Sequence, residues 1–291
     1  MASSLLKRMA ALVGATCAAM TLAVSVAAGP AAADEGSFED PSAMAAACST
    51  TAKSGYVPFS QRGGYRIHVP SGISASGAPM VVAIHGGQSN PQTHQDASGW
   101  NALADQKKFI VVYPRGGKSE GTDQWGWDAN DADVNYIKAV VANVRATYCV
   151  NPKRIHLSGH SNGGQMASRA GCVAPELFAS GAVYAPAPPP TGCNPSRAIS
   201  WGVFASASDP VVFEPVAYSH VMYWSWENRP CSNERGDGGT DVKDSKIWDC
   251  ADGTKVLWRV YNNGSHGWPT GARKTEMLNR MWSLFQASPR P

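Results

Sequence analysis

Residues 155–166 read IHLSGHSNGGQM, a stretch that predicts a buried strand, a tight turn and a helix in direct succession. The turn holds the pattern G-x-S-x-G, in which Gly159 and Gly163 stand two residues before and after Ser161. Glycine is needed there because such a turn brings the strand and the helix too close together for larger side chains. The serine hydroxyl is then exposed at the end of the strand, so we predict that Ser161 is a nucleophile.

A five-residue pattern can arise by chance in a chain with 29 glycines, so the motif alone does not indicate catalysis. If the motif is catalytic, an acid should follow the serine along the chain. Asp209 meets the condition because it directly follows an apolar strand predicted at 200–205. Its alternative role is to cap a turn, for which an Asp-Pro pair is suited. We prefer Asp209 to the aspartates between residues 237 and 252, which fall in a predicted polar loop.

A general base must follow as well, and two histidines, His220 and His266, come after Asp209. His220 falls in a helix predicted at 215–226, whereas His266 lies in a glycine-containing loop directly after a strand predicted at 256–261. Such a loop can carry an imidazole over the serine, and an aspartate can then hold the imidazole in one tautomer. We therefore predict that His266 is the base and that Asp209 orients it.

The apolar run MVVAI at residues 80–84 ends in His85-Gly86-Gly87. In open α/β sheets, ligands collect at this carboxyl end of the strands. Glycines in such a loop let the backbone approach a reacting carbonyl group. We predict that the backbone N–H groups of Gly87 and Asn162 form an oxyanion hole, and that His85 hydrogen-bonds within its own loop.

Strands alternate with helices along the chain, which predicts an α/β fold with a largely parallel sheet. The unbroken apolar runs at 80–84 and 109–113 are typical of strands covered by helices on both faces, whereas the alternation at 65–69 predicts a half-exposed edge strand. The APAPPP run at 185–190 predicts a rigid surface loop. Further strands are expected at 154–157, 180–184, 200–205 and 256–261, and helices at 100–107, 132–148, 215–226 and 275–285.

Residues 1–33 have the features of a secretory signal peptide: two basic residues, an apolar segment and a final Ala31-Ala32-Ala33. A lipid-modified cysteine at Cys17 is a minor alternative. We expect residues 34–54 to form a loosely held arm and residues 55–291 to form one catalytic domain. Cleavage leaves 23 basic and 22 acidic side chains, a net charge of about +1 that favours neither nucleic acid nor an anionic membrane as a partner.

Six cysteines remain after cleavage, an even number that favours disulfide bonds in an exported protein. Their spacing does not resemble that of a zinc site, and we expect no metal. We favour a bond between Cys231 and Cys250, which would close the polar segment between them. The pairing of the other four is left open by the sequence: Cys48, Cys149, Cys172 and Cys193.

The chain resembles the secreted esterases that group feruloyl esterases with poly(3-hydroxybutyrate) depolymerase-like enzymes. The resemblance runs from about residue 60 to 285. The matching pieces are His85-Gly86, Trp100-Asn101-Ala102-Leu103-Ala104, Val111-Val112-Tyr113-Pro114, Gly126-Trp127, Asp133-Val134, residues 159–166, residues 208–212 and residues 266–269.

This resemblance implies an α/β-hydrolase fold and a monomeric serine carboxylester hydrolase that works through an acyl-enzyme without a cofactor. The acyl group could be a hydroxycinnamate, a hydroxyalkanoate or acetate, the last as in an acetyl xylan esterase. A different hypothesis is an inactive hydrolase domain that binds polymer surfaces. Three tryptophans, Trp125, Trp127 and Trp268, are candidates for substrate binding, with packing inside the fold as their alternative role. The few residues after the last helix lead us to expect soluble esters to be better substrates than crystalline polyester.

Overall fold

A computed structural model describes residues 48–119, 122–126, 131–236 and 238–291 of the chain. The predicted signal peptide, most of the predicted arm and Trp127 lie outside these residues. No helix in the described part is long and apolar enough to cross a membrane.

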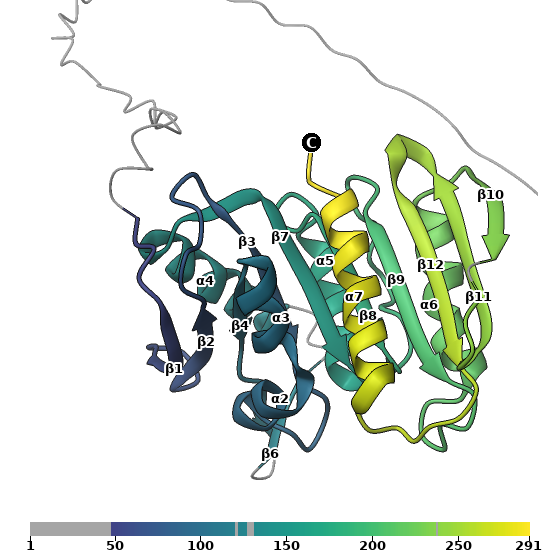
Figure 1. Cartoon of the computed structure of the whole chain (residues 1–291), viewed down its shortest axis with the longest axis horizontal. Coiled ribbons are helices and arrows are strands. Elements are labelled where there is room, and N and C mark those ends of the chain that lie inside the picture. The colour runs from purple at the N-terminus through teal and green to yellow at the C-terminus, as the bar shows by residue number, and fades with distance from the viewer. Residues whose placement is uncertain (1–47, 120–121, 127–130, 237) are drawn as a thin grey trace, which may run out of the picture. The chain divides into compact units, whose positions relative to one another are not determined.

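The described residues form a ten-stranded sheet with the order β1-β2-β4-β3-β7-β8-β9-β12-β11-β10 (Figure 1). The six central strands, from β4 to β12, run parallel, whereas the two strands at each edge are antiparallel to their neighbours. The strands are β1 (Lys53–Pro58), β2 (Gly64–Val69), β3 (Ala78–Ile84), β4 (Ile110–Tyr113), β7 (Val150–His160), β8 (Ser180–Tyr184), β9 (Ser200–Ser206), β10 (Cys231–Gly236), β11 (Val242–Cys250) and β12 (Lys255–Tyr261), and β5 (Gly117–Ser119) and β6 (Thr122–Gln124) form a separate hairpin.

Helices cover both faces of the sheet, which is why β4, β8 and β9 are buried along their whole length. Figure 1 shows α3 and α7 on one face and α4, α5 and α6 on the other. This arrangement confirms the predicted α/β-hydrolase fold class. The helices are α2 (Pro91–Ser98), α3 (Trp100–Lys107), α4 (Ala132–Thr147), α5 (Asn162–Val173), α6 (Glu214–Glu227) and α7 (Gly271–Ala287), with a short 3₁₀ turn η1 at Ala251–Gly253.

Three local predictions were wrong. The strand at 65–69 is not an edge strand, because β1 pairs with it on the outer side. The segment after Cys231 is not a polar loop but the antiparallel hairpin of β10 and β11, which pairs with β12. Ala185 and Pro186 are buried rather than on the surface, because they follow β8 directly and Pro186 packs against Gly164.

Three disulfide bonds join the six cysteines of the described residues: Cys48–Cys149, Cys172–Cys193 and Cys231–Cys250. Cys231 lies directly opposite Cys250 in the antiparallel register of β10 and β11, which brings the two Cα atoms to 3.9 Å. The described residues all belong to one compact unit, Asp40–Pro291.

Candidate active site

Ser161 forms the turn between β7 and α5 with φ +52° and ψ −122°. A Cβ atom on Gly159 would lie 2.3 Å from the carbonyl oxygen of Gly163, and a Cβ on Gly163 would lie 2.1 Å from that of His85. Both distances are far shorter than a van der Waals contact. A larger residue at 159 would force β7 and α5 apart, and one at 163 would force α5 away from the end of β3. The two glycines therefore permit the turn that exposes the serine.

The structure brings Ser161, His266 and Asp209 together at the carboxyl ends of β7, β12 and β9. The Nε2 atom of His266 lies 2.8 Å from the Oγ of Ser161, and its Nδ1 lies 2.9 Å from the Oδ2 of Asp209. The other carboxylate oxygen of Asp209 accepts the backbone N–H groups of Val211 and Val212, at 2.8 and 2.9 Å. The Asp209 side chain is fully buried and fixed, and such a chain of groups can pass a proton from the hydroxyl to the imidazole.

The loop that carries His266 has no regular structure, and side chains from other elements hold its backbone. The hydroxyl of Tyr184 donates to the carbonyl of Ser265 at 3.2 Å. The indole N–H of Trp268 donates to the carbonyl of Ser98 at 3.0 Å. The imidazole of His160, the residue before Ser161, lies with its Nε2 2.7 Å from the carbonyl oxygen of His266. His160 had no role in the sequence prediction, although its place beside the serine was a usable signal.

Gly87 and Asn162 are neighbours, because a Cβ on Gly87 would lie 3.7 Å from the Cβ of Asn162. The Asn162 side chain accepts the backbone N–H of Trp125 at 3.0 Å, which ties the first turn of α5 to the segment before α4. His85 is fully buried; its Nδ1 lies 2.8 Å from the Gly86 carbonyl, and its Nε2 accepts the N–H of Gly116. Burial lowers the pKa of His85 to about 4, so this histidine is a neutral part of the loop.

The structure contradicts a substrate-binding role for Trp125. This side chain is 3% exposed, and its indole N–H donates to the carbonyl of His85 at 2.9 Å. Trp125 therefore packs against the loop of His85 instead of presenting an aromatic surface. Trp268 is partly buried against His94 and His160, while it also lines a cavity of about 390 Å³. Trp127 lies outside the described residues.

His220 lies in α6, fully buried, with its Nε2 against the carbonyl of Ala187. Burial lowers its pKa to about 4. The structure therefore does not bring His220 to Ser161, which already has His266 at hydrogen-bond distance.

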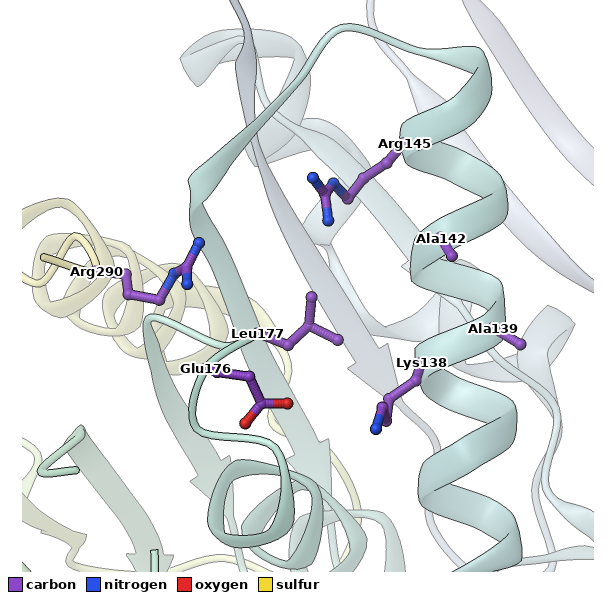
Figure 2. A pocket seen from close by; sticks show the side chains of 7 residues that line it. All are labelled: Lys138, Ala139, Ala142, Arg145, Glu176, Leu177 and Arg290. Carbon is purple, nitrogen blue, oxygen red and sulfur yellow. The ribbon is translucent and has the colours of Figure 1, made fainter. Parts of the chain in front are cut away.

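A second cavity, of about 520 Å³, contains none of the residues predicted as a site. Figure 2 shows its lining side chains, with Lys138 and Arg145 from α4, Leu177 from the segment before β8 and Arg290 near the chain end. The cavity at the His266 loop is the one that adjoins Ser265, Gly267 and Trp268.

A sequence profile of the family described as esterase PHB depolymerase matches residues 63–220, just over half of the chain. Among curated proteins, poly(3-hydroxyalkanoate) depolymerase C of Paucimonas lemoignei is 36% identical over 129 residues, which make up 42% of this chain and 30% of that protein. A bifunctional acetylxylan esterase/xylanase of Neocallimastix patriciarum is 32% identical over 143 residues, 44% of this chain and 21% of that protein. The chain thus spans less than a third of each of these two relatives.

Among solved structures, an acetyl xylan esterase from Aspergillus awamori superposes with a TM-score of 0.64 at 17% identity, covering 81% of this chain and 100% of that one. A ferulic acid esterase from Anaeromyces mucronatus, in complex with ferulic acid, gives a TM-score of 0.57 at 16% identity and covers 81% of this chain and 91% of that one. At these identities, the likeness shows a shared fold.

Proposed function

Because the chain belongs to the esterase PHB depolymerase family, we propose that it is a secreted serine carboxylester hydrolase. The observation that carries this proposal is the hydrogen-bonded series from Ser161 through His266 to Asp209. The residues occur along the chain in the order serine, aspartate, histidine, as is usual in α/β-hydrolases. Export is supported by the signal-peptide pattern of residues 1–33 and by disulfide bonds, which persist in oxidising compartments.

In the proposed reaction, the Oγ of Ser161 attacks the ester carbonyl carbon while the Nε2 of His266 takes the hydroxyl proton. The tetrahedral intermediate expels the alcohol, which leaves with that proton, and an acyl-enzyme remains. A water molecule then attacks the acyl carbon and gives a proton to His266. When the bond to Oγ breaks, His266 returns that proton to Ser161 and the acid is released. Asp209 holds Nδ1 of His266 and stabilises the imidazolium that forms in both halves.

The oxyanion would lie between the backbone N–H groups of Gly87 and Asn162. Two observations support this assignment: the closeness of the two residues, and the position of Asn162 as the first residue of α5, where the helix dipole favours negative charge. Donors fixed in this way are worth roughly 3–4 kcal/mol of barrier height each.

The candidate acyl groups are hydroxycinnamate, a short hydroxyalkanoate and acetate. The names of the relatives support this range: one is an acetylxylan esterase/xylanase, one is a depolymerase of poly(3-hydroxyalkanoate), and one solved neighbour holds ferulic acid. A panel of methyl ferulate, p-nitrophenyl acetate and a polyhydroxybutyrate film would rank the three groups for the purified mature protein.

The decisive experiment is labelling with a fluorophosphonate probe, which reacts with activated serines. Wild-type protein should be labelled, and the Ser161→Ala variant should not. A wild type that resists the probe and hydrolyses none of the panel would favour the alternative, an inactive hydrolase domain that binds polymer surfaces.

A further inference from the structure

The last residue of β7, His160, and the residue that follows it, Ser161, contact two ends of the same loop residue. Ser161 contacts the imidazole of His266 at 2.8 Å, and His160 contacts the backbone carbonyl of His266 at 2.7 Å. These contacts join positions more than a hundred residues apart in the chain. The peptide unit between His160 and Ser161 therefore joins the contact to the His266 backbone with the contact to its imidazole. In this way it fixes the distance between the proposed nucleophile and the proposed base.

The environment of His160 fixes its tautomer and its orientation. A carbonyl oxygen only accepts hydrogen bonds, so the Nε2 of His160 must carry the proton. Its ring stacks on Tyr184 at 5.8 Å between centroids and meets Trp268 edge-on at 5.9 Å. A Cβ on Gly86 would lie 3.0 Å from Nδ1, so the loop of the proposed oxyanion hole also packs against this ring.

We propose that His160 is a positioning residue for this active site: its Nε2–H holds the backbone of His266 so that the imidazole of His266 meets the Oγ of Ser161. The inference rests on the proposed function. It assigns to His160 a hydrogen-bond donor role that does not require titration. The other contacts described for the 262–270 loop hold its backbone at residues other than His266: Tyr184 donates to the carbonyl of Ser265, Trp268 donates to that of Ser98, and Arg273 donates to that of Asn263.

Charged and titratable groups face His160 from several elements: His94 of α2, Tyr184 of β8, Asp209 after β9 and His266 after β12. Burial and the nearby His266 lower the pKa of His160 to about 4, against the opposing effects of the bond to the His266 carbonyl and of Asp209. His160 is accordingly neutral at pH values well above 4. A neutral donor adds no positive charge beside the imidazolium that forms on His266.

The test compares His160→Leu, which removes the donor, with His160→Gln, whose amide nitrogen reaches about as far as Nε2. The matched control is His156→Leu, the same change at a second histidine of β7, which is fully buried, contacts Ser180 and stacks on Phe285. The readouts are the rate constant of fluorophosphonate labelling and kcat and KM on p-nitrophenyl acetate, measured below the melting temperature of each folded variant.

A misplacement near 1 Å can lower a rate by about 100-fold, so we expect His160→Leu to lose roughly 10- to 100-fold in labelling and kcat, with little change in KM. The Gln variant should recover most of this loss, and the His156 variant should change melting temperature without changing the labelling rate. Full labelling of His160→Leu, no recovery with Gln, or an equal loss in His156→Leu would each overturn the inference. A wild type that is not labelled at all would instead overturn the proposed function.

Discussion

Ser161 has a backbone conformation that residues with a side chain rarely adopt, with φ +52° and ψ −122°. Such a residue costs on the order of 1–3 kcal/mol, and it persists because the surrounding contacts leave no alternative. Glycine adopts this region without strain. The position therefore combines the function that we propose with a local loss of stability.

Replacing Ser161 should separate these two effects. We expect both Ser161→Ala and Ser161→Gly to lose roughly 10³-fold or more in ester hydrolysis, because each removes the proposed nucleophile. The Gly variant should also melt at a higher temperature than the Ala variant, because it relieves the strain at φ +52°. Calorimetry on the two variants checks the second point. A tenth of wild-type activity in either variant would refute the role of Ser161.

The two histidines after Asp209 should respond differently to alanine. His266→Ala should lower kcat by a factor comparable to that of Ser161→Ala, because its imidazole contacts both Ser161 and Asp209. His220→Ala should mainly lower stability, because it leaves the carbonyl of Ala187 without its buried partner. Melting curves and initial rates on one soluble ester are sufficient. The opposite ranking would assign the base to His220.

The helix α5 packs closely against β7 and against the end of β3. Gly163→Ala should be strongly destabilising, since a Cβ would lie 2.1 Å from the carbonyl oxygen of His85 and 2.5 Å from that of Ile84. Relief requires α5 to move away from the loop that carries Gly87. We expect a loss of at least about 3 kcal/mol in unfolding free energy, the scale of severe core overpacking. Gly238→Ala, where a Cβ meets no atom within 4 Å, is the control and should be neutral in a urea titration.

The hairpin of β10 and β11 forms the edge of the sheet and also reaches the active site. Asp241, in its turn, forms an ion pair with Arg273 at 2.6 Å, and Arg273 donates to the carbonyl of Asn263 in the loop of His266. The disulfide Cys231–Cys250 closes this hairpin. If the strand pairing of this hairpin loosens, the position of the His266 loop should therefore change as well.

Removing disulfides should destabilise the protein in proportion to the logarithm of the loop that each closes. The sequence separation is 19 for Cys231–Cys250 and 101 for Cys48–Cys149. Chain entropy gives upper values of roughly 3 and 5 kcal/mol. We therefore expect the double Cys→Ser variant of Cys48 and Cys149 to have a lower denaturant midpoint than the double variant of Cys231 and Cys250. Equal or reversed midpoints would show that local packing outweighs chain entropy.

Taken over the whole molecule, several histidines are buried in the neutral state. Burial lowers the pKa to about 4 for His85, His160 and His220 and to about 3 for His156, and it lowers the pKa of His94 as well. In the unfolded chain, each histidine titrates near 6.5. Above that pH, neither state binds the proton and the protein has its full stability. As the pH falls from 6.5 towards 4, the unfolded state takes up protons that the folded state excludes, so stability is lost.

We therefore predict a steep decrease in unfolding free energy between pH 6.5 and 4. Each excluded proton contributes about 1.4 kcal/mol per pH unit to the slope. Urea titrations across this range provide the measurement. His156→Leu should reduce the slope by one proton, because it removes one buried histidine. A stability that stays level between pH 6.5 and 4.5 would contradict the prediction.

The sequence by itself determined the parallel core and the expected positions of Ser161, Asp209 and His266. It could do so because the signals are local: an unbroken apolar run predicts a doubly covered strand, and glycines around a serine predict a tight turn. Residues that directly follow parallel strands must meet at one edge of the sheet. The family resemblance, later supported by the profile match at 63–220, came from the same local motifs.

Tertiary structure alone decided the features that depend on partners distant in the chain. The strand at 65–69 is not at the edge of the sheet because β1 pairs with it. The polar segment after Cys231 forms two strands because the backbone of β12 is free to pair with β11. Trp125 is buried and donates to the carbonyl of His85, and His160 contacts the carbonyl of His266, 106 residues away in the chain. No local pattern encodes such contacts, because which groups are buried together is fixed only when the strands take their order in the sheet.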